Sequence, residues 1–379
     1  MNTCSVTPHQ RTRALIGAVT AGILAVASTV GGTPTPASAA NTLTMRGADV
    51  SSLQRSLDLG AKYYDADGVA REPLDILKSV GVNYVRLRVW NNPISGYNNK
   101  SAVLAQARVA RVKGLKVLVD FHYSDTWADP GKQYKPAAWA SHSLSQLRTD
   151  VYTFTYDVCS SLRGQGTPPD SVQIGNEINV GMLWNEGKVV NNDFAPLAGL
   201  LRQGYNATKA CGSGIPVMIH TANADSNANA RWFYDGIRAQ GVQWDITAQS
   251  YYCMWHGTLS NLYNNIVDLR GRYGKPVVIV ETAYPFTRNN ADSEPNAIGD
   301  ATCDGIGATW AGQAQEFDWV QNTARNAGAI GVFYWEPTWY AVSGNGWDPA
   351  NINGTGNQWD NMAVFNWSGR VNPGVRWTP

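Results

Sequence analysis

The feature that most constrains the fold is a regular alternation of short apolar runs with helical stretches. Eight runs rich in aliphatic and β-branched residues recur along the chain, each the length of one strand. They cover residues 45–50, 84–90, 116–123, 171–177, 216–222, 245–252, 276–282 and 331–337. Segments between them, such as AVLAQARVARVKG, have helical spacing, and several end in Gly, a common helix stop. Eight strands that alternate with helices predict a (β/α)8 TIM barrel, an α/β fold in a single domain.

A doubly wound open sheet is the alternative to the barrel. Such sheets usually carry a glycine-rich phosphate turn after the first strand, whereas this chain reads RGADVSSLQRS there. No linker rich in Pro or Ser follows residue 41. We therefore expect residues 40–379 to form one catalytic barrel.

The first residues have the order of a secretory signal peptide. Arg11 and Arg13 precede the apolar run ALIGAVTAGILAVASTV, and the sequence ASA occupies residues 37–39. A membrane anchor is the alternative, but the run is short for a bilayer span. We expect residues 1–39 to be removed and the mature protein to be secreted, extracellular and free of the membrane.

The composition favours a neutral partner with flat faces. The chain has 30 basic and 29 acidic residues, so it lacks the positive surface that nucleic acids require. It has 15 Trp and 17 Tyr, and the clusters WEPTWY and CMWHG indicate an aromatic surface that stacks on sugar rings. We expect a monomer that binds a neutral polysaccharide.

Two glutamates end strand-like runs in this scheme. Glu177 ends the fourth run and Glu281 ends the seventh, and barrel enzymes have their active site where the strands end. A surface Glu at the start of a loop is the ordinary alternative for each one alone. Because side chains alternate along a strand, we expect Gln173 to share the inward face with Glu177, and Val277 and Ile279 to share it with Glu281.

Paired carboxyl groups at one site are typical of glycoside hydrolysis. One group must be protonated and the other ionised, so their surroundings must separate their pKa values. A buried Arg86 beside Glu281 would keep that carboxylate ionised, and His220 could donate toward Glu177. The side chains that we expect near the two glutamates all lie at or near strand ends: Arg86, Arg88, Trp90, His122, Asn176, His220, Tyr252 and Trp335.

Other hydrolase chemistries lack their motifs. The sequence contains no Gly-x-Ser-x-Gly and no His-Glu-x-x-His, and no nucleotide-binding loop. A catalytically silent glycan-binding barrel is the other class of function, and the two intact glutamates disfavour it.

Seven stretches give the chain a resemblance to a known family. They are RGADVSSL, GVNYVRLRVWNNP, DFHYSDTWADPGKQ, IGNEINVGMLW, SYYCMWHG, KPVVIVETAYPF and FYWEPTWY, between residues 46 and 340. The chain resembles the endo-β-1,4-galactanases of glycoside hydrolase family 53, within the superfamily of retaining (β/α)8 glycosidases. The resemblance implies endo-hydrolysis of β-1,4-D-galactosidic linkages in pectic galactan, or type I arabinogalactan, by double displacement and without a catalytic cofactor. A mannanase- or cellulase-like relative is the alternative.

The resemblance also implies residue roles. Glu177 matches the general acid/base and Glu281 matches the nucleophile. Asn176 matches a contact to the sugar 2-hydroxyl, Arg86 an arginine beside the nucleophile, and Trp335 a platform under the cleaved sugar.

A structural calcium ion is a further implication of the resemblance. The matching positions are Asn290, Asp292, Glu294, Asn296, Asn357 and Asp360. The spacing matches the family, but several identities differ, and a polar solvated loop is the alternative. Oxygen ligands of this kind suit calcium.

Barrel topology predicts how the cysteines pair. Cys4 belongs to the segment that we expect to be removed. Cys159 and Cys211 lie near the ends of helices, which places both toward the face opposite the active site. Cys253 and Cys303 follow strands and lie on the active-site face. Disulfide geometry limits the Cα separation to about 7 Å, so we expect the pairs 159–211 and 253–303.

Overall fold

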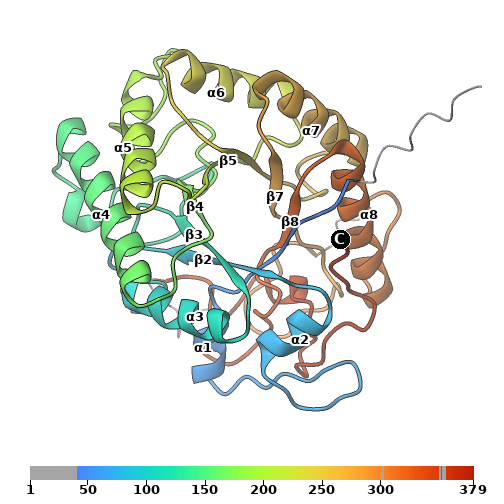
Figure 1. The fold of residues 1–379 in the computed structure, drawn as a ribbon. Coiled ribbons are helices and arrows are strands. Elements are labelled where there is room, and N and C mark those ends of the chain that lie inside the picture. The colour runs from blue at the N-terminus through green and yellow to red at the C-terminus, as the bar shows by residue number, and fades with distance from the viewer. Residues whose placement is uncertain (1–40, 300–302, 350, 352–355) are drawn as a thin grey trace, which may run out of the picture. The chain divides into compact units, whose positions relative to one another are not determined.

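Eight parallel strands close into a barrel in the order β1 to β8, and helices surround this ring in Figure 1. The computed structural model describes residues 41–299, 303–349, 351 and 356–379. The predicted TIM barrel is therefore confirmed. The segment expected to be a signal peptide lies outside the described residues. Among the described residues, no helix combines the length and the apolarity that crossing a membrane requires.

All eight predicted strands are present, each one to three residues shorter than predicted. The strands are β1 Met45–Asp49, β2 Tyr84–Val89, β3 Lys116–Phe121, β4 Ser171–Ile174, β5 Val217–Thr221, β6 Ile246–Ser250, β7 Val277–Glu281 and β8 Gly331–Tyr334. The α-helices are α1 Leu53–Asp58, α2 Pro73–Ser79, α3 Lys100–Val112, α4 Leu144–Gly164, α5 Ala195–Cys211, α6 Asn227–Ala239, α7 Leu259–Tyr273 and α8 Trp310–Ala327.

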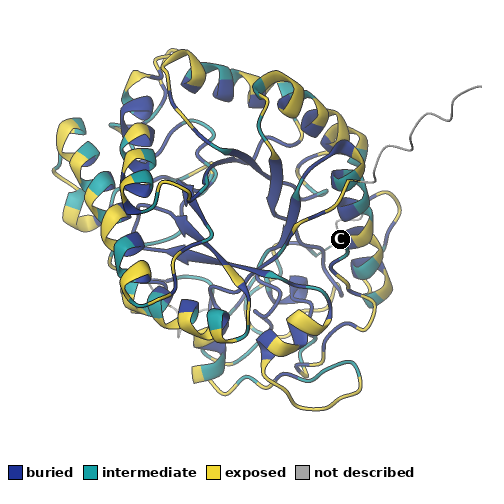
Figure 2. Ribbon diagram, viewed as in Figure 1, coloured by how far each residue is buried: buried dark blue, intermediate teal, exposed yellow. Residues whose placement is uncertain are grey.

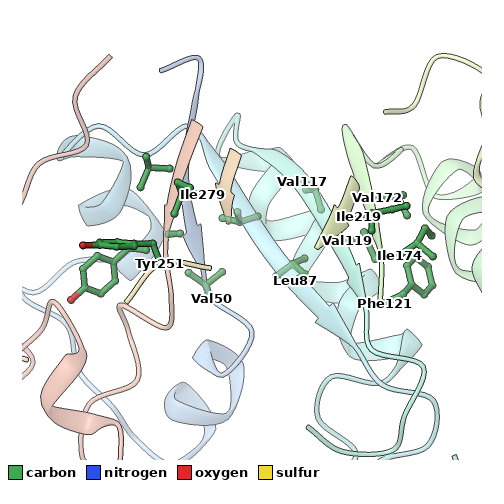
Figure 3. Close-up of a cluster of buried hydrophobic side chains, with 14 of the residues drawn as sticks. Val50, Leu87, Val117, Val119, Phe121, Val172, Ile174, Ile219, Tyr251 and Ile279 are labelled. Atoms are coloured by element: carbon green, nitrogen blue, oxygen red, sulfur yellow. The ribbon is translucent and has the colours of Figure 1, made fainter. Parts of the chain in front are cut away.

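Alternation along the strands divides the apolar core into two layers. Outward-facing residues pack under the helices, and Figure 3 shows several of them, including Leu87, Val119 and Ile174. Inward-facing residues such as Leu118 and Phe333 form a second cluster in the interior of the barrel. The strands are accordingly buried on both faces, while the helices expose their outer sides in Figure 2.

The seventh strand departs from simple alternation. Val278 and Val280 belong to the interior layer, and Val277 and Ile279 pack outward, so our expectation for these last two residues was wrong. The register with β6 shifts here, because Gln249 pairs with Ile279 while Ser250 pairs with Glu281. This irregularity has the effect of a β-bulge, which re-aims a side chain. It returns Glu281 to the inner face.

Local signals begin and end the helices. The Ser143 hydroxyl and the Gln146 side chain form a capping box at the start of α4. Helices α7 and α8 end at Gly274 and Gly328, which both adopt left-handed backbone angles. The short turns that follow return the chain to the next strand.

Two disulfides join the elements that the topology argument paired. Cys159 of α4 is bonded to Cys211 at the end of α5, with a Cα separation of 6.1 Å. Cys253 after β6 is bonded to Cys303 in the loop after β7, with a Cα separation of 5.9 Å.

Candidate active site

A cleft of about 380 Å³ opens at the carboxyl ends of the strands. Its size lies in the range of small-molecule sites. Glu177, which follows β4, and Glu281, which ends β7, both line it, although they are far apart in the sequence. Five tryptophans contribute to its walls: Trp127, Trp255, Trp335, Trp347 and Trp359.

Glu281 is held by two donors. Its Oε1 accepts from Arg86 Nη1 at 2.7 Å, and its Oε2 accepts from the Tyr252 hydroxyl at 2.9 Å. Burial raises the pKa of Glu281, and the positive charge of Arg86 and the Tyr252 hydrogen bond oppose that rise. Both contacts favour the carboxylate, fix its orientation and leave it facing the cleft.

Arg86 is the hub of a buried charge network. Its side chain is 1% exposed and contacts Asp49 at 2.8 Å and Asp120 at 2.9 Å in addition to Glu281. Nη2 donates to the Asn176 Oδ1 at 2.7 Å. Burial would lower the pKa of Arg86, but Asp120, Glu281 and Asp49 outweigh it and raise the pKa. The guanidinium therefore stays charged and holds Asn176 beside Glu281.

Glu177 lies in a different environment. It follows β4 with a φ of 50°, a left-handed value that is uncommon outside Gly and concentrates at functional sites. Its Oε1 accepts from the Ser250 hydroxyl at 2.6 Å, and no cation contacts it in the described part of the chain. Burial, followed by the negative charge of Glu281, raises the pKa of Glu177 to about 8. A protonated carboxyl group near neutral pH can donate a proton to a leaving group.

His220 contacts Glu177 differently from our expectation. Its Nε2 lies 2.8 Å from the Ser250 Oγ, so its contact with the carboxyl group runs through that hydroxyl. Its Nδ1 lies 3.3 Å from the Glu177 backbone nitrogen. His220 is buried and is absent from the residues that line the cleft.

Arg88 lines the cleft but has protein partners. It donates to the Glu336 Oε1 at 2.6 Å and to the Ser52 Oγ at 2.9 Å. Its guanidinium carbon lies 4.0 Å from the ring centroid of Trp127. Burial raises the pKa of Glu336 to about 7, and the neighbouring Arg88 opposes that rise. Arg88 is thus positioned to support an aromatic wall.

Trp90 and His122 form a pair next to this wall. The Trp90 indole donates to the His122 Nδ1 at 3.1 Å, and the His122 Nε2 lies 3.0 Å from Asp120. His122 lines the cleft, whereas Trp90 does not. Trp90 therefore orients a cleft residue and has no direct access to a ligand there.

The aromatic wall is a set of mutually packed rings. Trp335 meets Trp359 edge to face with ring centroids 5.6 Å apart, and Trp127 stacks on Trp339 at 5.9 Å. Trp255 is half-exposed and contacts both Tyr252 and Trp359 through its ring. Rigid indole faces of this kind suit sugar rings.

Several residues of the site were missed from the sequence. Ser250 lies two residues before Tyr252, and Asp120 lies two residues before His122, so strand alternation was a usable signal for both. Asp49 is the last residue of β1, so its place at a strand end was also a usable signal. Trp127 lies in a loop, and its contact with the cleft has no counterpart in strand spacing.

The expected calcium positions lie in two loops that hydrogen-bond to each other. The Asn357 backbone donates to the Asp292 carboxylate at 2.7 Å, and the Ala297 backbone donates to the Gln358 carbonyl at 2.8 Å. Asp360 is fully buried, and neither carboxylate oxygen has a hydrogen-bond partner among the described residues. The side-chain oxygen of Asn296 is also buried and has no hydrogen-bond partner among the described residues. Burial, followed by the negative charge of Asp292, raises the pKa of Asp360 to about 7.

The other expected ligands already make hydrogen bonds with the protein. Asn357 uses its side chain to bond the Trp339 carbonyl and the Trp359 backbone nitrogen. The Glu294 carboxylate accepts from the Trp347 indole at 3.3 Å, and the Asn290 amide donates to the Asp292 carbonyl. The buried oxygens of Asp360 and Asn296 are therefore the ones that a cation would satisfy.

Comparison with known proteins gives a consistent result. The model of glycosyl hydrolase family 53 matches residues 45–377. An arabinogalactan endo-β-1,4-galactanase of Cellvibrio japonicus is 35% identical over 84% of this chain and 85% of its own. An endo-β-1,4-galactanase of Bacillus subtilis strain 168 is 31% identical over 88% of this chain and 84% of its own. The solved GH53 catalytic domain of Ignisphaera aggregans is 38% identical, with a TM-score of 0.83 over 90% of this chain and 96% of that one.

Proposed function

The chain belongs to glycosyl hydrolase family 53 and is a glycosidase, and on that premise we propose that it hydrolyses β-1,4-galactosidic linkages within galactan chains with retention of configuration. Pectic galactan, the neutral β-1,4-linked part of type I arabinogalactan, is the proposed substrate. The names of the relatives at 31–35% identity support this choice over mannan or cellulose.

The observation that carries the proposal is the contrast between the two cleft glutamates. Glu281 is held by a cation and a phenol, as a nucleophile requires, and Glu177 by a single neutral hydroxyl, as an acid requires. In the first step the Glu281 carboxylate attacks the anomeric carbon while Glu177 gives its proton to the departing glycosidic oxygen. In the second step Glu177 takes a proton from water, whose oxygen attacks the anomeric carbon and releases Glu281.

The remaining cleft residues have proposed roles in this scheme. Asn176, fixed by Arg86, has an amide hydrogen left for the sugar 2-hydroxyl after donating to the Ala128 carbonyl. Trp335 provides a platform under the sugar. His122 and Tyr252 line the same cleft and complete the polar floor.

We also propose that a calcium ion joins the loops after β7 and β8. The buried, unpartnered oxygens of Asp360 and Asn296 support this proposal, and Asp292 lies close enough to raise the pKa of Asp360. These oxygens fit a hard cation that prefers carboxylate and amide ligands. The ion would neutralise a buried carboxylate, which is a structural role and not a catalytic one.

Export remains part of the proposal. The charged start, apolar run and ASA sequence of residues 1–39 support secretion. A secreted enzyme would meet its polymeric substrate outside the cell. Mass spectrometry of the exported protein tests cleavage after Ala39, and light scattering tests the expected monomer.

Reducing-end release on galactan, mannan and cellulose tests the proposed substrate. We expect galactan to be cleaved at least tenfold faster than the other two, with long fragments appearing first. Glu281→Gln protein serves as the control for contaminating activity. Preference for mannan or cellulose would refute the substrate, and inactivity on all three would favour a glycan-binding barrel.

A further inference from the structure

One imidazole holds Glu177 at both its backbone and its side chain. The Glu177 backbone nitrogen donates to the His220 Nδ1 at 3.3 Å. On the other side of the ring, the His220 Nε2 lies 2.8 Å from the Ser250 Oγ, and that hydroxyl donates to the Glu177 Oε1 at 2.6 Å. His220 and Ser250 lie on the adjacent strands β5 and β6, and both are 0% exposed.

The contacts of Nδ1 decide which nitrogen of His220 carries the proton. A backbone N–H can only donate, so Nδ1 must accept from Glu177, and the Gln173 amide nitrogen also lies 3.0 Å away. The opposite tautomer would donate to the Asn176 Oδ1 at 3.0 Å. That oxygen already accepts from Arg86, and the Glu177 N–H would then have no acceptor among the described residues.

The ring is also neutral. Burial, followed by the positive charge of Arg86, lowers the pKa of His220 well below its usual range. A neutral imidazole has one proton, which the contacts above assign to Nε2. The Ser250 Oγ is therefore the acceptor of that proton, and the hydroxyl hydrogen is left to point at the Glu177 Oε1.

This orientation restricts where the catalytic proton can sit. Because Ser250 donates to Oε1 whether the carboxyl group is ionised or neutral, Oε1 has to remain the unprotonated oxygen. We propose that His220 and Ser250 are positioning residues that keep the acid proton of Glu177 on Oε2, the oxygen that Ser250 leaves free. The proposal rests on the proposed function, because it assigns the atom of the acid that reaches the glycosidic oxygen.

The charges around Glu177 set the direction of the test. Glu281 and Asp129 disfavour its ionised form, and Arg86 favours it. Ser250 is the side-chain donor to the ionised form, so loss of its hydroxyl should make Glu177 a weaker acid. Other titratable groups around this site are the buried His220 and Tyr252 and the cleft residues Asp49, Arg88, His122, Lys132 and His256.

Ser250→Ala is the first variant. A hydrogen bond to an ionised group is stronger than one to a neutral group, so loss of the Ser250 hydroxyl raises the pKa of Glu177. We therefore expect the alkaline limb of kcat/KM on galactan to move up by about one to two pH units. Ser250→Thr, which restores a hydroxyl, should return the limb toward its wild-type position. Aryl β-galactosides with good leaving groups should be hydrolysed at nearly wild-type rates, because they need little protonation.

A matched control lies on the same two strands. Thr221→Val removes a buried hydrogen bond from the Gln249 amide, 2.7 Å long, on the outward side of β5 and β6. It should reduce stability as Ser250→Ala does and leave the pH profile unchanged. An alkaline limb that stays in place in Ser250→Ala, or moves equally in Thr221→Val, would overturn the proposal.

The tautomer can be measured without any variant. His122 and His256 also accept through Nδ1, so the His220 signal is the one that is lost in His220→Gln. Nitrogen-15 NMR of histidine-labelled wild-type protein should show that this signal belongs to a neutral ring with its proton on Nε2. A proton on Nδ1 would overturn the proposal whatever the substrate. Wild-type reducing-end assays are done first, and the pH comparison uses whichever β-1,4-glycan is cleaved, so a wrong substrate is distinguished from a wrong proton position.

Discussion

At the scale of single residues, the site depends on giving one residue type two environments. Glu281 accepts hydrogen bonds from Arg86 and Tyr252, whereas Glu177 accepts one from the Ser250 hydroxyl and is repelled most strongly by the charge of Glu281. The sequence located both glutamates because strand ends are visible in the pattern. Alternation with Tyr252 could have placed Ser250 on the inner face but not shown its role, which arises from contact with a histidine 30 residues away.

The pKa of Glu177 predicts the alkaline side of the pH profile. Glu177 must be protonated to act as an acid, and its pKa is raised to about 8. We expect kcat/KM to fall as the pH rises through about 8, because the proton is then lost. Initial rates on galactan from pH 4 to 10 measure this. A fall that begins below pH 6 would contradict the assignment.

Removal of each glutamate should have a different consequence. Glu281→Ala should lose all hydrolysis, and added azide should give the α-galactosyl azide, since azide then attacks in place of the carboxylate. Glu177→Ala should keep activity on aryl galactosides with good leaving groups and give the β-azide. Product NMR distinguishes the two. The β-azide from Glu281→Ala would show that the roles are exchanged.

Arg86 should be required for stability as well as activity. Arg86→Met leaves three buried carboxylates without their cation, which typically costs about 3–5 kcal/mol. The loss should be larger at pH 8 than at pH 5, because unpaired carboxylates take up protons more readily at the lower pH. Urea unfolding at both pH values measures it.

The control is Arg111→Met, which breaks a partly exposed pair with Asp170 and should cost no more than about 1 kcal/mol. Equal losses in the two variants would contradict a special role for the Arg86 network.

At the scale of elements, the predicted alternation held in most strands and failed at the end of β7. Within PVVIVET, no Gly or Pro follows Pro276 to indicate an irregularity at the end of the strand, and the shift depends on pairing with Gln249 and Ser250 of β6. A sequence pattern contains the period of one strand but not its register with a neighbour. For that reason Glu281 was located correctly while Val277 and Ile279 were assigned to the wrong face.

The loops after β7 and β8 should respond to calcium. A free concentration a hundredfold above the Kd contributes about 2.7 kcal/mol to stability, which corresponds to a rise in Tm of about 4 °C for a domain of this length. We expect this rise when calcium is added to protein treated with EDTA, measured by calorimetry. Asp360→Asn should abolish it.

Asp304→Asn, which changes an exposed carboxylate of the same loop after β7, should leave the rise intact. A Tm that is insensitive to calcium in the wild type would contradict the ion, and equal loss in both variants would contradict its proposed ligands.

At the scale of the whole molecule, the strand count determines most of what the sequence could predict. Eight short runs separated by helices specify a closed barrel, and the barrel specifies one catalytic face. The two disulfides followed from the same topology, because each joins residues on one face. Loop residues such as Trp127 and Trp359 were beyond such reasoning, since loop paths depend on tertiary contacts.

The central claim is that Glu177 and Glu281 act together as a retaining pair on β-1,4-galactan. Proton NMR of the first products, recorded faster than mutarotation, tests it most directly. The account predicts that new reducing ends appear first as the β anomer, with the α anomer growing only later. First appearance of the α anomer would mean that water attacks the sugar directly, and would contradict Glu281 as the nucleophile.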